Sequence, residues 1–202
     1  HPTETTATGK PLYIPEMIFG HLLTSTNYDK DEQKVVGGKN GYGAKLTNIF
    51  STSFKIETVD HVRQKKFVQE YSQNMKTIGT PKVTDYKRKP YTKISWIADF
   101  ARFGIQGYSV PMVKLMERRT YDIAGITDSK VQVYLNAQKV PVKDFEGYAQ
   151  KYLEPDTPLL YLKIDARWSL GISLSTDKFE QVSFVNGIMT SKGGKHVDCL
   201  TK

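Results

Sequence analysis

Four glycines between positions 37 and 43 run directly into a segment with helical apolar spacing, from Ala44 to Phe50. This feature requires a fold in which a glycine-rich loop opens onto the N-terminus of a helix. Residues without a Cβ atom let a ligand approach the backbone, and the first N–H groups of a helix have no partner inside it. The sequence therefore predicts a phosphate-binding site at residues 37–45.

Two lysines, Lys39 and Lys45, add positive charge to this loop. A charge-assisted hydrogen bond to phosphate contributes about 1.5–3 kcal/mol when it is partly desolvated. Lys45 is the stronger candidate because it falls in the first helical turn. The loop is not a P-loop, because Ala44 stands where that motif requires lysine, and Leu46 replaces the third glycine of the dinucleotide fingerprint. The alternative is a glycine-rich surface turn.

The rest of the first half predicts helices and strands in one soluble fold. A short helix is expected over residues 14–23, with Pro15 in its first turn. Alternating residues predict a strand at 54–58, a turn at 60–61, a second strand through residue 71 and further strand structure at 92–96.

The second half of the chain also predicts both helices and strands. Ser109 is expected to cap a helix that Gly125 ends. Residues 131–134 predict a strand that turns back at residues 136–137, and residues 145–153 have amphipathic helical spacing. Further strands are expected at 168–174 and 182–185. Two prolines within 154–158 interrupt regular structure, so we place a domain boundary there.

Composition narrows the class of protein. The chain has 202 residues, of which 39% are hydrophobic and 25% charged, as in soluble globular domains. Its net charge of +8 favours polyanionic partners. Cys199 is the single cysteine, so neither an internal disulfide nor a cysteine-rich zinc site is expected. No run approaches ~18 apolar residues, so no membrane contact is expected, and the missing initiator Met indicates a fragment.

Two segments closely resemble eukaryotic-type DNA topoisomerase II. They are residues 22–29 (Leu-Leu-Thr-Ser-Thr-Asn-Tyr-Asp) and 38–46 (Gly-Lys-Asn-Gly-Tyr-Gly-Ala-Lys-Leu). The resemblance continues through residues 48–52, 118–125, 183–187 and 192–198. It implies an α+β fold, namely an incomplete GHKL (Bergerat-type) ATPase sandwich followed by part of an α+β transducer domain. The implied domains are the C-terminal portion of the GHKL domain with its ATP lid, residues 1–153, and the start of the transducer domain, residues 154–202.

The resemblance also assigns nucleotide contacts. The implied ATP-binding residues are Ser25, Thr26, Asn27, Gly38, Lys39, Asn40, Gly41, Tyr42, Gly43, Ala44 and Lys45. Hydroxyl and amide groups can bond ribose and phosphate. Relatives often have Ser at the position of Thr26 and Arg at that of Lys39, and a lysine cannot make the forked contact of an arginine.

The resemblance implies that the groups needed for hydrolysis lie elsewhere. The family's general-base Glu and magnesium-binding Asn are expected upstream of residue 1, and its γ-phosphate-sensing Lys beyond residue 202. No catalytic residue and no metal ligand is therefore assigned in this chain. The implied cofactors are ATP and Mg²⁺, the implied partners are DNA and a second copy in a homodimeric gate, and the implied location is the nucleus.

Two other functions remain open from the residues alone. A glycine-loop kinase would need an acceptor-directed Asp and a metal-binding motif, and neither is visible. A basic nucleic-acid-binding module would explain the charge but not residues 37–45. The basic run formed by Lys82 and residues 87–89, near Tyr86 and Tyr91, could bind DNA by stacking or could be a solvated loop.

Overall fold

The computed structural model of the chain describes residues 2–5, 11–25, 27, 29, 37–38, 40–175 and 177–201. These residues form two compact units. Unit 1 comprises the described residues up to 29 together with Gly38–Gly107, and unit 2 comprises Gly37 and the described residues from Tyr108 onward. No helix in the described ranges is both long enough and apolar enough to cross a membrane.

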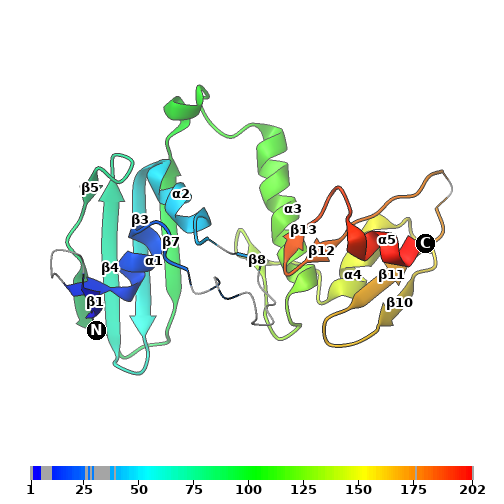
Figure 1. The fold of residues 1–202 in the computed structure, drawn as a ribbon, viewed down its shortest axis with the longest axis horizontal. Helices are drawn as coiled ribbons and strands as arrows, with labels where there is room; N and C mark the ends of the chain where they lie inside the picture. Colours follow the sequence, from blue (N-terminus) through cyan, green and yellow to red (C-terminus); the bar gives the residue numbers. More distant parts are fainter. Residues whose placement is uncertain are drawn as a thin grey trace. The chain divides into compact units, whose positions relative to one another are not determined.

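Unit 1 is built on an antiparallel sheet of five strands with the order β5-β4-β3-β7, in which β6 also pairs with β4 (Figure 1). The strands are β3 (Ser51–Asp60), β4 (Lys65–Ser72), β5 (Thr77–Ile78), β6 (Lys82–Asp85) and β7 (Thr92–Ala98). Phe54 pairs with Tyr71, and Ile56 pairs with Gln69. Because side chains alternate between the two faces of a strand, these residues share one face of the sheet.

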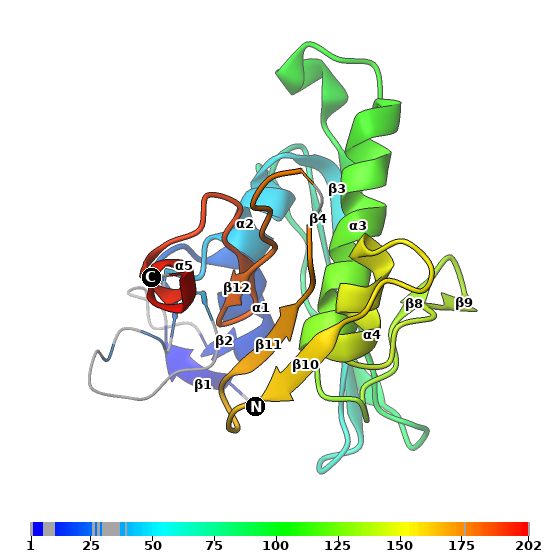
Figure 2. The ribbon, with the colours of Figure 1, turned by 90° about the vertical axis from the view of Figure 1, so that its right-hand side faces the viewer.

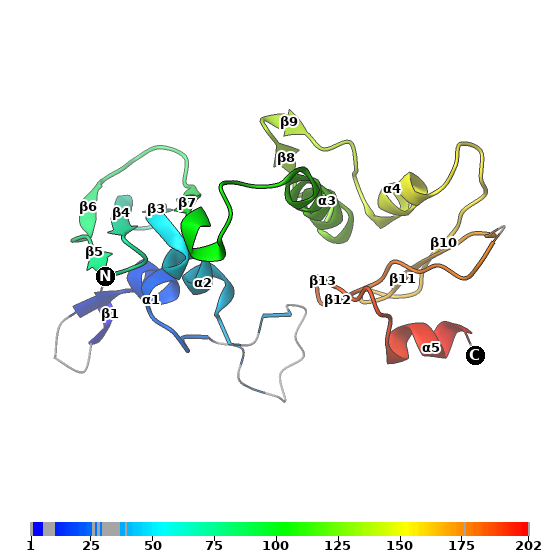
Figure 3. The ribbon, with the colours of Figure 1, turned by 90° about the horizontal axis from the view of Figure 1, so that it is seen from above.

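Two short helices cover that face, α1 (Ile14–Gly20) and α2 (Gly43–Ile49), as Figure 3 shows. A two-stranded pair formed by β1 (Pro2–Thr5) and β2 (Pro11–Tyr13) precedes α1. The core contains Phe54, Ile56, Phe67 and Tyr71, with Phe19 of α1 packed on Phe54. The predicted strands are confirmed, and so is the start of the helix predicted at 14–23, but that helix ends at Gly20 because His21 is extended. A 3-10 helix (Phe100–Phe103) follows β7.

Unit 2 is centred on the long helix α3 (Val110–Ile126), against which α4 (Phe145–Ala149) packs (Figure 2). A 3-10 helix (Gln150–Tyr152) continues α4. Three hairpins and a helix complete the unit: β8 (Tyr134–Leu135) with β9 (Gln138–Lys139), β10 (Leu160–Lys163) with β11 (Ser169–Ile172), β12 (Phe184–Val185) with β13 (Ile188–Met189), and α5 (Lys195–Thr201). Its core consists of Ala124, Val140, Val142 and Tyr148.

The expectation that Gly125 ends α3 is wrong. The helix continues to Ile126, and Thr127 follows it in an extended conformation. Gly125 is instead required by packing, because a Cβ atom there would lie 2.6 Å from the Cβ and Cγ atoms of Tyr148. A glycine ends a helix when it adopts a left-handed conformation, and Gly125 does not.

Other boundaries differ by a few residues. The hairpin turn at residues 136–137 is confirmed, but its first strand is only Tyr134–Leu135. The domain boundary placed at residues 153 and 154 lies within unit 2, where β11 packs on α4 at Gly171 and Ala149. As a division between the GHKL and transducer domains, it stays a prediction.

Candidate functional site

The two segments assigned to nucleotide binding contact each other in unit 1. The side-chain amide of Asn27 donates a hydrogen bond of 2.6 Å to the carbonyl oxygen of Gly38. The backbone N–H of Asn27 also donates to the hydroxyl of Ser25, at 3.2 Å. Ser25 and Asn27 therefore lie beside the start of the glycine-rich loop, as a shared ligand would require.

Lys45 of α2 makes a second link, to the residue just before Ser25. Its side chain is only 2% exposed, and its ammonium group donates a hydrogen bond of 3.1 Å to the carbonyl oxygen of Thr24. The single O–H of Thr24 lies within hydrogen-bond distance of the carbonyl oxygens of both Met17 (3.1 Å) and His21 (3.0 Å), which ties this position to the end of α1. Burial lowers the pKa of Lys45 below its ordinary value of 10.5.

Among the residues that the structure describes, no side chain compensates the charge of Lys45. An ammonium group has three N–H donors, and within the described residues Thr24 is its only hydrogen-bond partner and no carboxylate pairs with it. Burying a charge without a counter-charge is unfavourable. An anionic oxygen at this ammonium group would supply both the missing charge and the missing acceptors.

Gly41 gives the loop its close approach to this ammonium group. Its φ of +65° is a left-handed conformation that favours glycine. A Cβ atom at Gly41 would lie 2.8 Å from the Thr24 carbonyl oxygen and 3.1 Å from Nζ of Lys45. The glycine therefore leaves open the space around Nζ that any other residue would fill.

The start of α2 offers further donors. Tyr42 is the N-cap residue, and it makes no side-chain hydrogen bond to the first turn. Leu46 donates to the Tyr42 carbonyl oxygen, so the N–H groups of Gly43, Ala44 and Lys45 precede the helical hydrogen bonds. Gly43 and Ala44 are exposed, and apart from the adjoining backbone no heavy atom of the described residues lies within 4 Å of a Cβ built on Gly43.

The structure brings together five of the predicted site residues, namely Ser25, Asn27, Gly38, Gly41 and Lys45. Asn40, Tyr42, Gly43 and Ala44 continue the loop into α2, while Thr26 and Lys39 lie outside the described residues. Two residues that anchor the site were not singled out from the sequence, Thr24 and Asn48. Asn48 is buried and donates to the Phe19 carbonyl oxygen at 3.1 Å, which fastens α2 to α1.

No group of three or more acidic, histidine or cysteine side chains that could hold a metal occurs within the ranges that the structure describes.

The two tyrosines beside the basic run near β6 contact other side chains. Tyr86 and Tyr91 meet edge to face at 6.0 Å, and the ammonium group of Lys66 lies over the Tyr91 ring. These rings already contact each other and a lysine, which does not favour them as a stacking platform.

Comparison with known proteins supplies the class of the molecule. No family model matches the chain. It is 47% identical to DNA topoisomerase 2 of Arabidopsis thaliana and 45% identical to that of Candida glabrata, in each case over 94% of the chain. The crystal structure of the ATPase region of Saccharomyces cerevisiae topoisomerase II matches 99% of the chain with a TM-score of 0.89 and 46% identity.

The fold and the loop therefore define part of the ATPase region of a type II topoisomerase, with the α+β GHKL architecture. The chain belongs to the eukaryotic DNA topoisomerase II family. It spans 14–15% of the length of the two relatives above and 53% of the yeast ATPase-region chain. The comparisons support neither a glycine-loop kinase nor a non-enzymatic nucleic-acid-binding module.

Proposed function

We propose that this chain supplies the triphosphate-binding part of the ATP site in a DNA topoisomerase II. The observation that carries the proposal is the buried ammonium group of Lys45, which is held between Thr24 and Gly41 without a carboxylate among the described residues. Two of its three N–H donors and its positive charge have no partner among the described residues, and a phosphate oxygen would supply one. The yeast structure that the chain resembles is of an ATPase region, and a similar Balamuthia mandrillaris structure is of the ATPase and transducer domains of DNA topoisomerase II.

Each segment has a role in this proposal. Lys45 binds a phosphate oxygen directly, and the backbone N–H groups between Gly38 and Lys45 surround the phosphates. Ser25, Thr26 and Asn27 supply hydroxyl and amide groups to the ribose and phosphates, and Lys39 adds charge at the loop. Asn40, Tyr42, Gly43 and Ala44 complete the loop.

Hydrolysis needs groups that the family resemblance assigns to other parts of the parent protein. Mg²⁺ bound with ATP offsets charge on the phosphates. By the family resemblance, the general-base Glu and the magnesium-binding Asn belong to the upstream part of the GHKL domain. In this proposal the GHKL domain includes residues 1–153, and the transducer domain includes residues 154–202. The isolated chain should therefore hydrolyse ATP negligibly, and rapid turnover by it would contradict this assignment.

In the parent protein, we propose that ATP binding closes a homodimeric gate that powers the passage of one DNA duplex through a double-strand break in another. This activity relaxes and decatenates DNA, and the parent acts in the nucleus. The proposal rests on the family, in which each relative named above is a DNA topoisomerase.

The test compares full-length parent enzyme carrying Lys45→Met with wild type. Loss of one charge-assisted hydrogen bond of about 1.5–3 kcal/mol should weaken ATP-analogue binding about 10- to 150-fold and reduce ATP-dependent decatenation. Lys143→Met is the matched control, because Lys143 is exposed and forms no ion pair within the described residues. Equal nucleotide affinity in Lys45→Met and wild type would contradict the assigned role.

A further inference from the structure

The glycine-rich loop begins against a hairpin of unit 2. A Cβ atom at Gly37 would overlap the side chain of Ile188 and would lie 3.2 Å from the carbonyl oxygen of Asn186. The space beside Ile188 thus admits no side chain at this position. The backbone of Gly37 thus rests directly on the tip of the β12–β13 hairpin.

The hairpin tip has a well-defined conformation. Val185 pairs with Ile188, and the two residues between them, Asn186 and Gly187, have φ values of +51° and +78°. Positive φ at both central positions is the type I′ pattern, whose twist matches that of the flanking strands. Asn and Gly are the residues that this turn favours, so the tip is a firm support.

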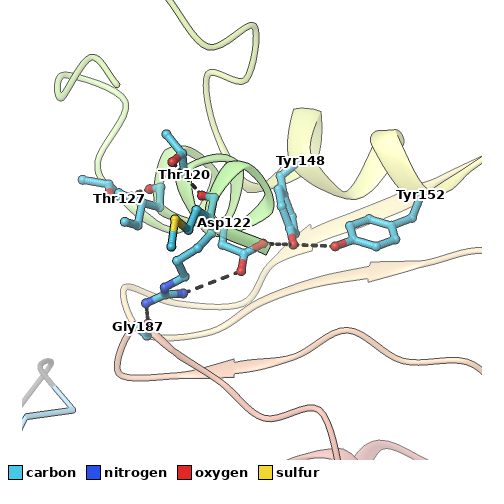
Figure 4. Close-up of polar contacts among 9 residues, drawn as sticks. Thr120, Asp122, Thr127, Tyr148, Tyr152 and Gly187 are labelled. Carbon is cyan, nitrogen blue, oxygen red and sulfur yellow. Dashed lines mark hydrogen bonds and ion pairs between the residues drawn. The ribbon is translucent and has the colours of Figure 1, made fainter. Parts of the chain in front are cut away.

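Arg119 fixes this tip to α3. Figure 4 shows Gly187 of the tip near Asp122 of α3, with the polar contacts between them drawn as dashed lines. Its Nη2 atom donates a hydrogen bond of 2.7 Å to the carbonyl oxygen of Gly187, and its Nη1 atom lies 3.7 Å from Oδ2 of Asp122. Asp122 is 2% exposed and accepts a hydrogen bond from the hydroxyl of Tyr148. The ring of Tyr148 also packs on Phe184 of β12, with 5.8 Å between the ring centroids. The tip is therefore held by a guanidinium group and by an aromatic contact.

We propose that Arg119 is a positioning residue for the phosphate loop and that the hairpin tip at residues 186–188 is the seat of the first residue of that loop, Gly37. The guanidinium group holds the Gly187 carbonyl, the tip holds Gly37, and Gly37 is bonded to Gly38. Because adjacent Cα atoms are separated by a fixed ~3.8 Å, a shift of Gly37 shifts the next residue with it. This inference rests on the proposed nucleotide site.

The proposal also has a reciprocal consequence. If the seat favours the loop conformation that binds nucleotide, then bound nucleotide stabilises the seat by the same factor. Arg119 and the hairpin thus give the second unit a means of sensing nucleotide. The link passes through the covalent chain at Gly37 and needs no direct contact between nucleotide and Arg119.

The first test is a double-mutant cycle in the full-length parent enzyme, with the affinity for a non-hydrolysable ATP analogue as the readout. Gly37→Ala should weaken that affinity about tenfold, because the added methyl group cannot fit beside Ile188. Ile188→Ala should alter it about threefold or less. The double variant should recover most of the affinity, because the shortened side chain leaves room for the methyl group.

A second test separates positioning from simple stabilisation. Arg119→Met should weaken analogue binding severalfold, and Arg119→Lys should recover part of it, because lysine can still donate to the Gly187 carbonyl. A purely structural role would lower the melting temperature of the nucleotide-free enzyme and leave the affinity unchanged. That outcome would overturn the positioning role.

The outcomes also separate this inference from the proposed function. If Lys45→Met binds the analogue normally, the nucleotide site itself is wrong. If Lys45→Met weakens binding while Gly37→Ala does not, only the seat is wrong. Should the variants fail to fold, hydrogen exchange of the wild-type enzyme decides the question. The amide of Thr190, which donates to Ser183 across the hairpin, should exchange severalfold more slowly with the analogue bound, and an unchanged rate would refute the seat.

Discussion

The hydroxyl of Tyr148 donates a hydrogen bond of 2.7 Å to Oδ1 of Asp122, and both side chains are buried in unit 2. Burial is the main cause that raises the pKa of Tyr148 well above its ordinary value of 10.0, and its hydrogen bonds with Tyr152 and Asp122 act in the same direction. The phenol therefore remains a neutral donor. Since Asp122 also lies beside Arg119, this pair supports the contact that holds the β12–β13 hairpin.

Removing the phenol oxygen should destabilise unit 2. Tyr148→Phe leaves the buried Asp122 carboxylate without its hydrogen-bond donor, which should cost about 1–3 kcal/mol. The measurement is the opening free energy of amides in α3, by native-state hydrogen exchange.

Tyr134→Phe is the control for this change. Tyr134 is 54% exposed, and its hydroxyl donates to Gln132 at the surface. Its loss should change stability by less than about 0.5 kcal/mol. Equal losses of stability in the two variants would contradict the stabilising role of the buried hydrogen bond between Tyr148 and Asp122.

Gly125 provides a second prediction, in which packing opposes helix propensity. Alanine favours a helix interior over glycine by about 0.8–1.0 kcal/mol. The new methyl group would, however, meet Tyr148 at 2.6 Å, and overpacking costs about 1–3 kcal/mol. Gly125→Ala should therefore be destabilising, as a lowered opening free energy of α3 amides would show.

Gly147→Ala is the matched change on α4. A Cβ atom at Gly147 would meet only Asp144 Oδ1, at 3.4 Å. Alanine should therefore be neutral or stabilising by about 0.4–1 kcal/mol. A destabilisation equal to that of Gly125→Ala would contradict the packing argument.

Local patterns in the sequence predicted much of unit 1. Alternation at Phe54 and Ile56 indicates a buried sheet face, and the glycines before Ala44 indicate a loop that opens onto a helix. Both features are present. The resemblance placed residues 25–27 and 38–45 in one site, and the hydrogen bond from Asn27 to Gly38 joins the two segments. The nucleotide role of these residues stays a prediction.

What could not be predicted depends on contacts between distant residues. A glycine near the end of a helical pattern usually indicates the end of the helix. Only the position of Tyr148 shows that Gly125 is needed for close packing instead. A lysine beside a glycine-rich loop would ordinarily be exposed to solvent, yet Lys45 is buried and its ammonium group is bonded to the Thr24 carbonyl oxygen. Nothing local marks Gly37 as a neighbour of Ile188. Such partners are set by tertiary packing, which overrides local preference.

The β8–β9 turn offers a stabilising change. Asn136 and Ala137 have φ values of +50° and +64°. Alanine in a left-handed conformation costs roughly 1–2 kcal/mol, whereas glycine pays about 0.5–1 kcal/mol in chain entropy. Ala137→Gly should therefore raise stability by about 0.5–1 kcal/mol, measured as slower exchange of the Val140 amide that donates to Val133. Faster exchange would contradict the turn geometry.

Lys45 gives a prediction about pH. Its pKa in the folded protein is lowered by burial, so the unfolded chain binds more protons in the alkaline range below 10.5. Stability rises with pH wherever the unfolded state binds more protons. The unfolding free energy of wild type minus that of Lys45→Met should therefore become more positive as the pH increases from neutral towards 10.5. A difference that stays constant or shrinks over this range would argue against a buried, desolvated ammonium group.

Nucleotide binding should reverse this shift if Lys45 contacts phosphate. A nearby anion favours the charged ammonium group and raises its pKa, so binding should draw a proton from solution in the same alkaline range. Calorimetry of ATP-analogue binding in two buffers of different ionisation enthalpy measures this uptake. The uptake should depend on pH within the alkaline range below 10.5, where the lowered pKa of Lys45 leaves part of the free enzyme deprotonated. Lys45→Met, studied at saturating analogue, should lack this component, because methionine cannot accept the proton.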